Sequence, residues 1–147
     1  MTVLNSYKWW CLLFAAIQAQ AVTFDLQTVP DSPVVLTTYS PSMLRAEGGR
    51  RQFVTVKNVS DKVAVAMLFQ LTVPGTPRDE IVSLERVSVV FRPRETKRVS
   101  VNVEDVWTRL QSAGNPGAGS RQPVMSIVAV EFLDGSLWNA PTGGGHR

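Results

Sequence analysis

The sequence predicts an all-β domain, an antiparallel β-sandwich with one short helix, preceded by a leader segment. From residue 22 onward, β-branched residues come in short runs that are separated by Pro, Gly, Asn and Asp. Such runs are typical of strands joined by turns. Several runs alternate apolar and polar side chains, as half-buried strands do. Their regular spacing, with turns between them, favours an antiparallel sandwich over a βαβ arrangement.

The leader is the first feature along the chain. Lys8 precedes an apolar run over residues 9–17, which ends in Ala19-Gln20-Ala21. This order predicts a signal peptide, residues 1–21, cleaved after Ala21. Retention as a membrane anchor is the alternative, but the run is about half of the roughly 18 apolar residues that span a bilayer. Cys11 lies at the start of the run and not after it, which argues against a lipid anchor.

Export and composition together describe the remaining chain. We expect a periplasmic or extracellular domain over residues 22–140, without a membrane span, followed by a disordered tail over 141–147 that carries three consecutive glycines. Without Cys11 the mature chain has no disulfide, so apolar burial has to stabilise it. With 15 basic and 12 acidic residues and no long basic cluster, the chain offers no nucleic-acid interface. The sequence predicts no oligomeric state.

The first half of the domain contains three predicted strands. The strand at 34–39, closed by Ser40-Pro41, follows a proline-rich segment and is expected at a sheet edge. Residues 53–57 alternate as a half-buried strand does, and 58–62 form a turn. A long central strand follows over 63–73, with one face made by Val63, Val65, Met67, Phe69, Leu71 and Val73. Pro74 and Gly75 end it.

The second half begins with one or two strands in 81–91, where Val87, Val89 and Phe91 share a face. A turn at 92–96 and a half-buried strand at 98–103 come next. Asn102 is expected to cap a short helix over 104–110, which stops at Gly114. A flexible loop, 114–120, then leads to a hairpin of 124–133 and 136–139 around Asp134-Gly135. The predicted core residues are Val65, Phe69, Val101, Val130 and Phe132.

Three segments resemble one family. Residues 56–63, 91–99 and 130–138 are similar to sequence motifs of small exported immunoglobulin-like domains of bacteria. The resemblance covers roughly Val34 to Trp138. The resemblance implies an immunoglobulin-like β-sandwich. Arg94 stands where glycine is usual in such domains. Because these motifs are structural, the resemblance implies a fold and not an activity.

Residues able to support catalysis or metal binding are scarce. His146, the single histidine, lies in the glycine-rich tail, where no partner can orient it. The acidic pairs Asp79-Glu80 and Glu104-Asp105 could serve acid–base chemistry or calcium. Solvation in a turn and favourable charge at a helix start are the simpler interpretations. We therefore expect no catalytic, cofactor-binding or metal-binding residues, and a function that is independent of these five side chains.

Aromatic and basic side chains leave alternatives open. Trp107 and Trp138 fit core packing better than ligand stacking. The basic clusters fit a solvated face or edge-strand protection better than an acidic-ligand site; they are Arg50-Arg51, Arg92 with Arg94, and Lys97-Arg98. Asn58-Val59-Ser60 matches a glycosylation acceptor in some hosts and a polar turn in others.

The predicted function is a non-catalytic binding or accessory module that recognises another protein through its sheet face, an edge strand or the loop 114–120. An exposed aromatic patch around Trp107 would favour docking of this kind. The alternative is an inhibitor or chaperone-like protein that clamps an extended peptide along an edge strand. An unpaired edge strand with outward-pointing basic residues would favour this alternative. A third class, a small hydrolase, would need a concave pocket with paired carboxylates.

Overall fold

The computed structural model describes residues 22–75, 78–112 and 122–142. The predicted leader with its cleavage site, the loop 114–120 and His146 lie outside the described residues, as does most of the predicted tail.

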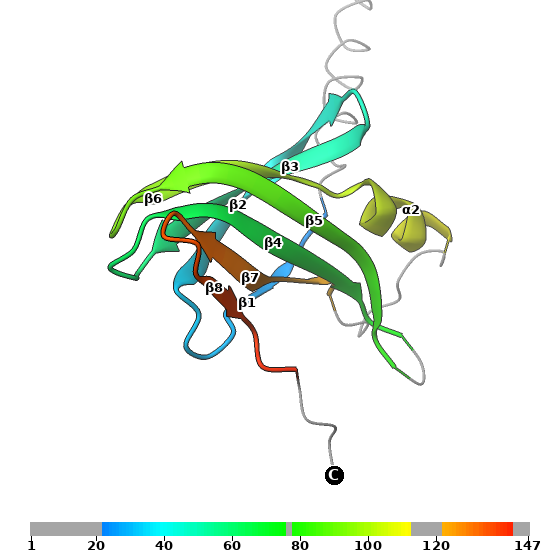
Figure 1. Ribbon diagram of the computed structural model, residues 1–147. Helices are drawn as coiled ribbons and strands as arrows, with labels where there is room; N and C mark the ends of the chain where they lie inside the picture. The colour runs from blue at the N-terminus through cyan, green and yellow to red at the C-terminus, as the bar shows by residue number, and fades with distance from the viewer. Residues whose placement is uncertain (1–21, 76–77, 113–121, 143–147) are drawn as a thin grey trace, which may run out of the picture.

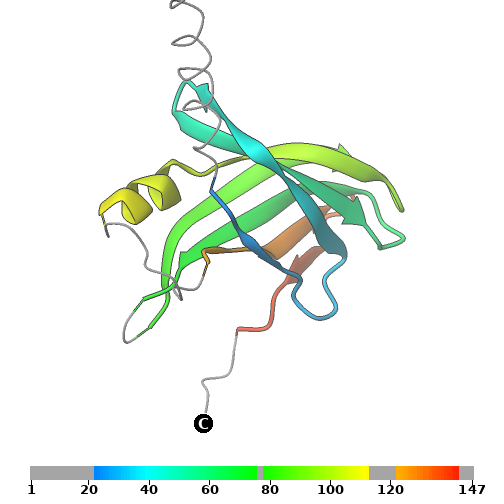
Figure 2. The same ribbon diagram turned by 180° about the vertical axis from the view of Figure 1, so that it is seen from behind.

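The chain forms two sheets that pack face to face, with one short helix at an end of the sandwich (Figures 1 and 2). The larger sheet has the order β1-β7-β4-β5. β8 also pairs with β7, on the same edge as β1 and further along that strand. Its strands are β1 (Asp25–Gln27), β4 (Ala64–Val73), β5 (Glu80–Phe91), β7 (Val124–Phe132) and β8 (Leu137–Asn139). The smaller sheet has the order β2-β3-β6, with β2 (Val34–Ala46), β3 (Gly49–Asn58) and β6 (Thr96–Asn102). The helix is α2 (Glu104–Ser112). Within residues 22–75, 78–112 and 122–142, the predicted all-β architecture with one short helix is confirmed.

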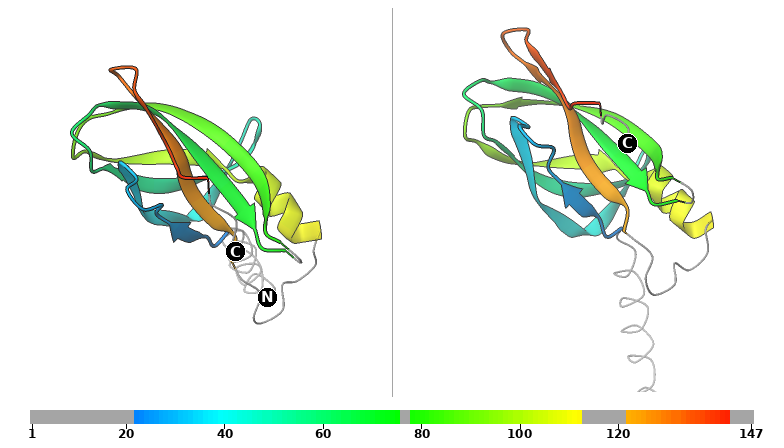
Figure 3. Two further views of the ribbon diagram at one scale, coloured as in Figure 1. Left: turned by 60° about the horizontal axis from the view of Figure 1, so that its bottom comes forward. Right: turned by 90° about the horizontal axis from the view of Figure 1, so that it is seen from below.

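The core lies between the two sheets (Figure 3). Phe69, Met67 and Leu71 of β4 and Phe91 of β5 are its largest fully buried side chains, and they face valines of the smaller sheet. Of the five predicted core residues, Phe69, Val101, Val130 and Phe132 are buried. Burial of side chains this large is the main source of stability in a domain without disulfides.

Val65 is the exception, and it corrects the prediction for β4. The pairing of β4 with both β5 and β7 shifts between Ala64 and Ala66, so the alternation changes phase there. Ala64 is buried, Val65 is half-buried, and from Met67 onward the odd-numbered residues face the core. A bulge adds one residue to a strand and reverses which residues face inward beyond it. A strict period of two cannot predict this.

The strands differ from the prediction in two further respects. The strand expected at 34–39 continues to Ala46, because its register with β3 shifts between Tyr39 and Met43 and it passes Pro41 without ending. The segment 81–91, predicted as one or two strands, lies within one strand, β5. β1 was not predicted, and it pairs in parallel with β7, so the sheet is not wholly antiparallel. The predicted edge position of β2 and the helix cap are confirmed, the latter by a 2.9 Å hydrogen bond from the Glu104 amide to Asn102 Oδ1.

Candidate protein-binding surface

One end of the sandwich collects three turns that the sequence places far apart: 59–63 between β3 and β4, 92–95 between β5 and β6, and 133–136 between β7 and β8. Asn58 organises this end. Its buried side chain donates to the carbonyl oxygens of Lys62 at 2.8 Å and Phe91 at 2.9 Å, and accepts from the amide and hydroxyl of Ser60. Both hydrogens of Asn58 Nδ2 are therefore used inside the fold. A glycan on that nitrogen is incompatible with this arrangement, so the acceptor motif serves as a polar turn.

Arg94 adopts the backbone conformation that glycine would supply, with a φ of 65°. Its amide donates to the Asn58 carbonyl at 2.9 Å, and its guanidinium donates to the Val59 carbonyl at 2.7 Å and pairs with Asp61 at 3.0 Å. The left-handed region is unfavourable for a residue with a Cβ. Arg94 thus adopts this conformation without being a glycine, and its side chain ties two turns together.

The β7–β8 hairpin completes this end. Hydrogen bonds from the hydroxyl and amide of Ser136, helped by the Lys62 ammonium 3.1 Å away, lower the pKa of Asp134 to about 2. Lys62 also lies over the ring of Phe132. A shallow hollow of about 290 Å³ lies here, lined by Lys62, Val63, Leu133 and Asp134. Its charged groups are paired with each other, which makes it a structural junction and a poor binding site for an ion.

The outward face of the larger sheet is the second candidate surface, and it carries aliphatic side chains where a solvated sheet would carry polar ones. We define the aliphatic face as the outward-pointing aliphatic side chains of this sheet on β4, β5 and β8. Four of them are more than half exposed, and a fifth is partly buried: Ile81 (55% exposed), Leu84 (58%), Val90 (59%) and Leu137 (55%), together with Leu68 on β4. Single exposed apolar residues are ordinary, but a set on one sheet face marks an interaction surface.

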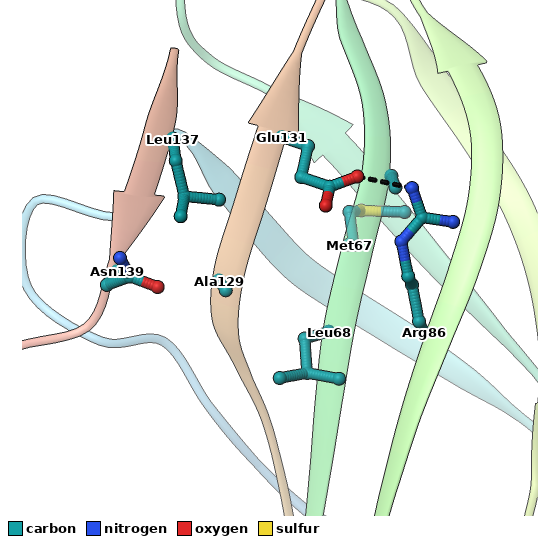
Figure 4. Close-up of a pocket in the computed structure, with 8 residues that line it drawn as sticks. Met67, Leu68, Arg86, Ala129, Glu131, Leu137 and Asn139 are labelled. Atoms are coloured by element: carbon teal, nitrogen blue, oxygen red, sulfur yellow. Dashed lines mark hydrogen bonds and ion pairs between the residues drawn. The ribbon is translucent and has the colours of Figure 1, made fainter. Parts of the chain in front are cut away.

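A hollow of about 200 Å³ lies within the aliphatic face (Figure 4). The small side chains of Ala66 and Ala129 leave it open, and Leu68 and Leu137 border it. Arg86 on β5 and Glu131 on β7 form an ion pair that crosses over β4 at this point. Ala66 pairs with Glu131 on one side, and a larger side chain there would stand in the path of the ion pair.

The long edge of β5, by contrast, is covered. Where β5 and β6 run past each other, Lys97 of β6 donates to the Val90 carbonyl of β5 at 2.7 Å, and Glu85 of β5 accepts from the Asn102 amide of β6 at 2.6 Å. The start of β5 packs against α2, where Glu80 pairs with Arg109. On the other side of the larger sheet, β1 and β8 have three residues each. These edges offer little backbone to an added strand.

The acidic pairs singled out in the sequence are engaged in structural contacts. Glu104 accepts the Arg50 amide at 2.8 Å and the Arg50 guanidinium at 2.7 Å, and these hydrogen bonds lower its pKa. Asp79 accepts from the amide of Gly75 at 3.3 Å. The structure does not bring the two pairs together as a dyad, and Asp105 is exposed on the first turn of α2.

Trp107 and Trp138 are half-buried and pack against the core. The Arg50 guanidinium lies 4.8 Å from the centre of the Trp107 ring, so this region is not an exposed aromatic patch. Other basic side chains are also held: Arg51 pairs with Glu85 at 2.9 Å, and Arg98 lies 4.2 Å from the ring centre of Phe53. These contacts account for much of the positive charge that the sequence clusters.

Sequence reasoning missed the residues of the aliphatic face. A signal was present, because 81–91 carries apolar residues at both parities of an alternating strand, so Leu84 and Val90 could not face the core together with Val87 and Val89. The Arg86–Glu131 pair gave no such signal, since its members are 45 positions apart and meet only through β4.

Comparisons with family models, with curated proteins and with solved structures found no match to this chain. Among the described residues, no helix has the length and apolar character to cross a membrane. In the same residues, no three His, Cys, Asp or Glu side chains gather as a metal ion would require.

Proposed function

We propose that this chain is a non-catalytic, exported binding module that docks on another protein through the aliphatic face. The observation that carries the proposal is the set of more-than-half-exposed aliphatic side chains on β5 and β8. One of them, Leu137, borders the hollow that is bridged by Arg86 and Glu131. Interfaces combine an apolar centre with a few charged groups that fix orientation. The rigid sandwich beneath holds these side chains in place for a partner.

The immunoglobulin-like assignment is part of the proposal, and the strand order supports it. If β2, β3 and β6 are taken as strands A, B and E, then β4, β5, β7 and β8 occupy the places of C, C′, F and G. Export draws support from the residues that follow Ala21. Val22 and Phe24 are buried in the core, so a domain that begins directly after the predicted cleavage site would be complete.

At β5, the edge-strand clamp is supported less well than face docking. Side chains from β6 and the helix α2 cover the long edge of β5, and Lys97 of β6 already donates to that edge. A clamp would instead have to use the outer edge of β2 in the smaller sheet. A hydrolase would need a nucleophile with an adjacent base in a pocket. The hollow on the aliphatic face is lined by one carboxylate, Glu131, which is paired with Arg86.

Site-specific photo-crosslinking tests the proposal. A photoreactive amino acid at position 84 or 137 is expected to yield a covalent adduct with a protein in the source cell envelope. Leu44, which is 52% exposed on β2 of the other sheet, provides a matched control position. Adducts formed equally from position 44, or from neither position 84 nor position 137, would contradict docking on the aliphatic face. Amino-terminal sequencing of the exported protein is expected to begin at Val22.

A further inference from the structure

We propose that the partner of the aliphatic face is a second copy of this chain, related by a two-fold axis that runs parallel to β4. The proposal rests on the proposed function, because it names the occupant of the same surface. It follows from the positions of charge and apolar area on either side of β4.

Charge complementarity is the first step. Arg86 and Glu131 flank β4, one on β5 and one on β7, and their side chains are 56% and 43% exposed. A two-fold axis along β4 exchanges the β5 side of one copy with the β7 side of the other. Arg86 of each copy then lies opposite Glu131 of its neighbour, and the contact holds two cations and two anions in alternation. An isologous interface requires such self-complementarity.

Shape is the second step. Leu68 on β4 pairs with Arg86 on one side and Ala129 on the other, so it lies near the axis and meets its own copy. Under the same rotation, the backbone of the incoming Arg86 comes over Ala129, whose small side chain leaves the hollow open, and its guanidinium reaches along β7 toward Glu131 as it does within one chain (Figure 4). Leu84, two residues from Arg86 on the same face, then lies over Ser126 on the β7 half. The contact thus places Leu68 against its own copy, beside the charges that cross β4.

A strongly acidic or basic partner fits this surface less well. The charged groups within the hollow sum to zero, one Arg and one Glu, so the surface has no net charge with which to attract a strongly acidic or basic protein. A second copy carries the same Arg86 and Glu131, so its charges match those of this surface once the copy is turned about the two-fold axis.

Charge reversal gives a test with a built-in rescue. Arg86→Glu leaves two acidic groups on the face, and Glu131→Arg leaves two basic groups. Each variant alone is expected to sediment as a monomer at concentrations where the wild type forms a dimer. An equimolar mixture of the two variants is expected to form a heterodimer, because every crossed pair then joins opposite charges. Sedimentation equilibrium with one variant carrying a fluorophore measures this directly.

The double variant Arg86→Glu/Glu131→Arg keeps the ion pair within the chain and therefore guards against loss of folding. It is expected to dimerise with itself and not with the wild type. Leu44→Glu on the other sheet is expected to dimerise as the wild type does. A monomeric wild type at about 1 mM, the concentration range of weak complexes, would overturn the inference. So would single variants that dimerise like the wild type, or a mixture of folded variants that stays monomeric. Crosslinks from position 84 to a different protein, with a monomeric wild type, would retain face docking and reject the dimer.

Discussion

Asn58 Nδ2 lies 2.9 Å from the carbonyl oxygen of Phe91, and this bond holds the end of β3 against the end of β5. The same nitrogen holds the Lys62 carbonyl at 2.8 Å. Because Asn58 is completely buried, water cannot replace these contacts without opening the end of the sandwich. The turn after β3 and the end of β5 therefore depend on one side chain, and the third turn is joined to them through Val63 and Lys62.

Asn58→Ala is expected to lower the free energy of unfolding by about 2–4 kcal/mol, since it leaves two carbonyl groups without their donor in a buried setting. Urea denaturation measures the loss. Ser60→Ala removes a smaller contact on the same turn and is expected to cost about 1 kcal/mol. Equal effects of the two substitutions would contradict the central role of Asn58.

The bulge in β4 predicts that neighbouring apolar residues differ in their contribution to stability. Phe69→Ala is expected to cost about 3–5 kcal/mol, because the ring is fully buried between the sheets. Val65→Ala is expected to cost less than about 1.5 kcal/mol, because the side chain is only half-buried on the far side of the bulge. A strand without the bulge would make Val65 as sensitive as a core valine, so comparable losses would reject the observed register.

These two residues also show what the sequence could predict. Alternation correctly placed Phe69 and Val101 in the core, because Val101 pairs regularly with β3 and Phe69 pairs regularly with β5. The shift at Phe69 concerns its pairing with β7 and leaves the phase of β4 unchanged. Alternation failed at Val65, since a bulge is a backbone feature that leaves no trace in side-chain periodicity. β1 escaped prediction because three residues carry too little pattern, and its pairing with β7 is supplied by the tertiary fold.

The candidate surface was less accessible to sequence reasoning than the fold. Asp134-Gly135 and the turn after Asn58 were predictable, since local chemistry determines them. The meeting of three turns at one end, and of Arg86 with Glu131, depends on strand order. Strand order follows from packing of the whole chain and not from any one segment.

The left-handed conformation of Arg94 predicts an unusual order of stability among its variants. Arg94→Gly relieves about 1 kcal/mol of backbone strain and loses the bond to the Val59 carbonyl, so it is expected to remain within about 1 kcal/mol of the wild type. Arg94→Ala loses the same bond but keeps the strain, and is expected to be about 1 kcal/mol less stable than the glycine variant. Chemical denaturation of the three proteins under one condition measures the order. An alanine variant as stable as the glycine variant would show that the turn does not need a positive φ.

The low pKa of Asp134 predicts a loss of stability in acid. Its pKa is about 2 in the folded chain, against an ordinary value of 3.8, so the unfolded chain binds more protons between these values. Its contribution is therefore fully present above about pH 4 and disappears as the pH falls toward 2. Because the Ser136 hydroxyl and amide are the main cause, and Lys62 a lesser one, 1 M NaCl is expected to leave most of the effect in place.

Asp134→Asn is expected to lower stability at pH 7 and to flatten the dependence of stability on pH between pH 4 and pH 2. Asp105→Asn, on the exposed first turn of α2, is the matched control and is expected to keep the wild-type slope. Thermal melts at intervals of half a pH unit compare the three proteins, and parallel curves for the wild type and Asp134→Asn would show that the hairpin carboxylate is not linked to folding.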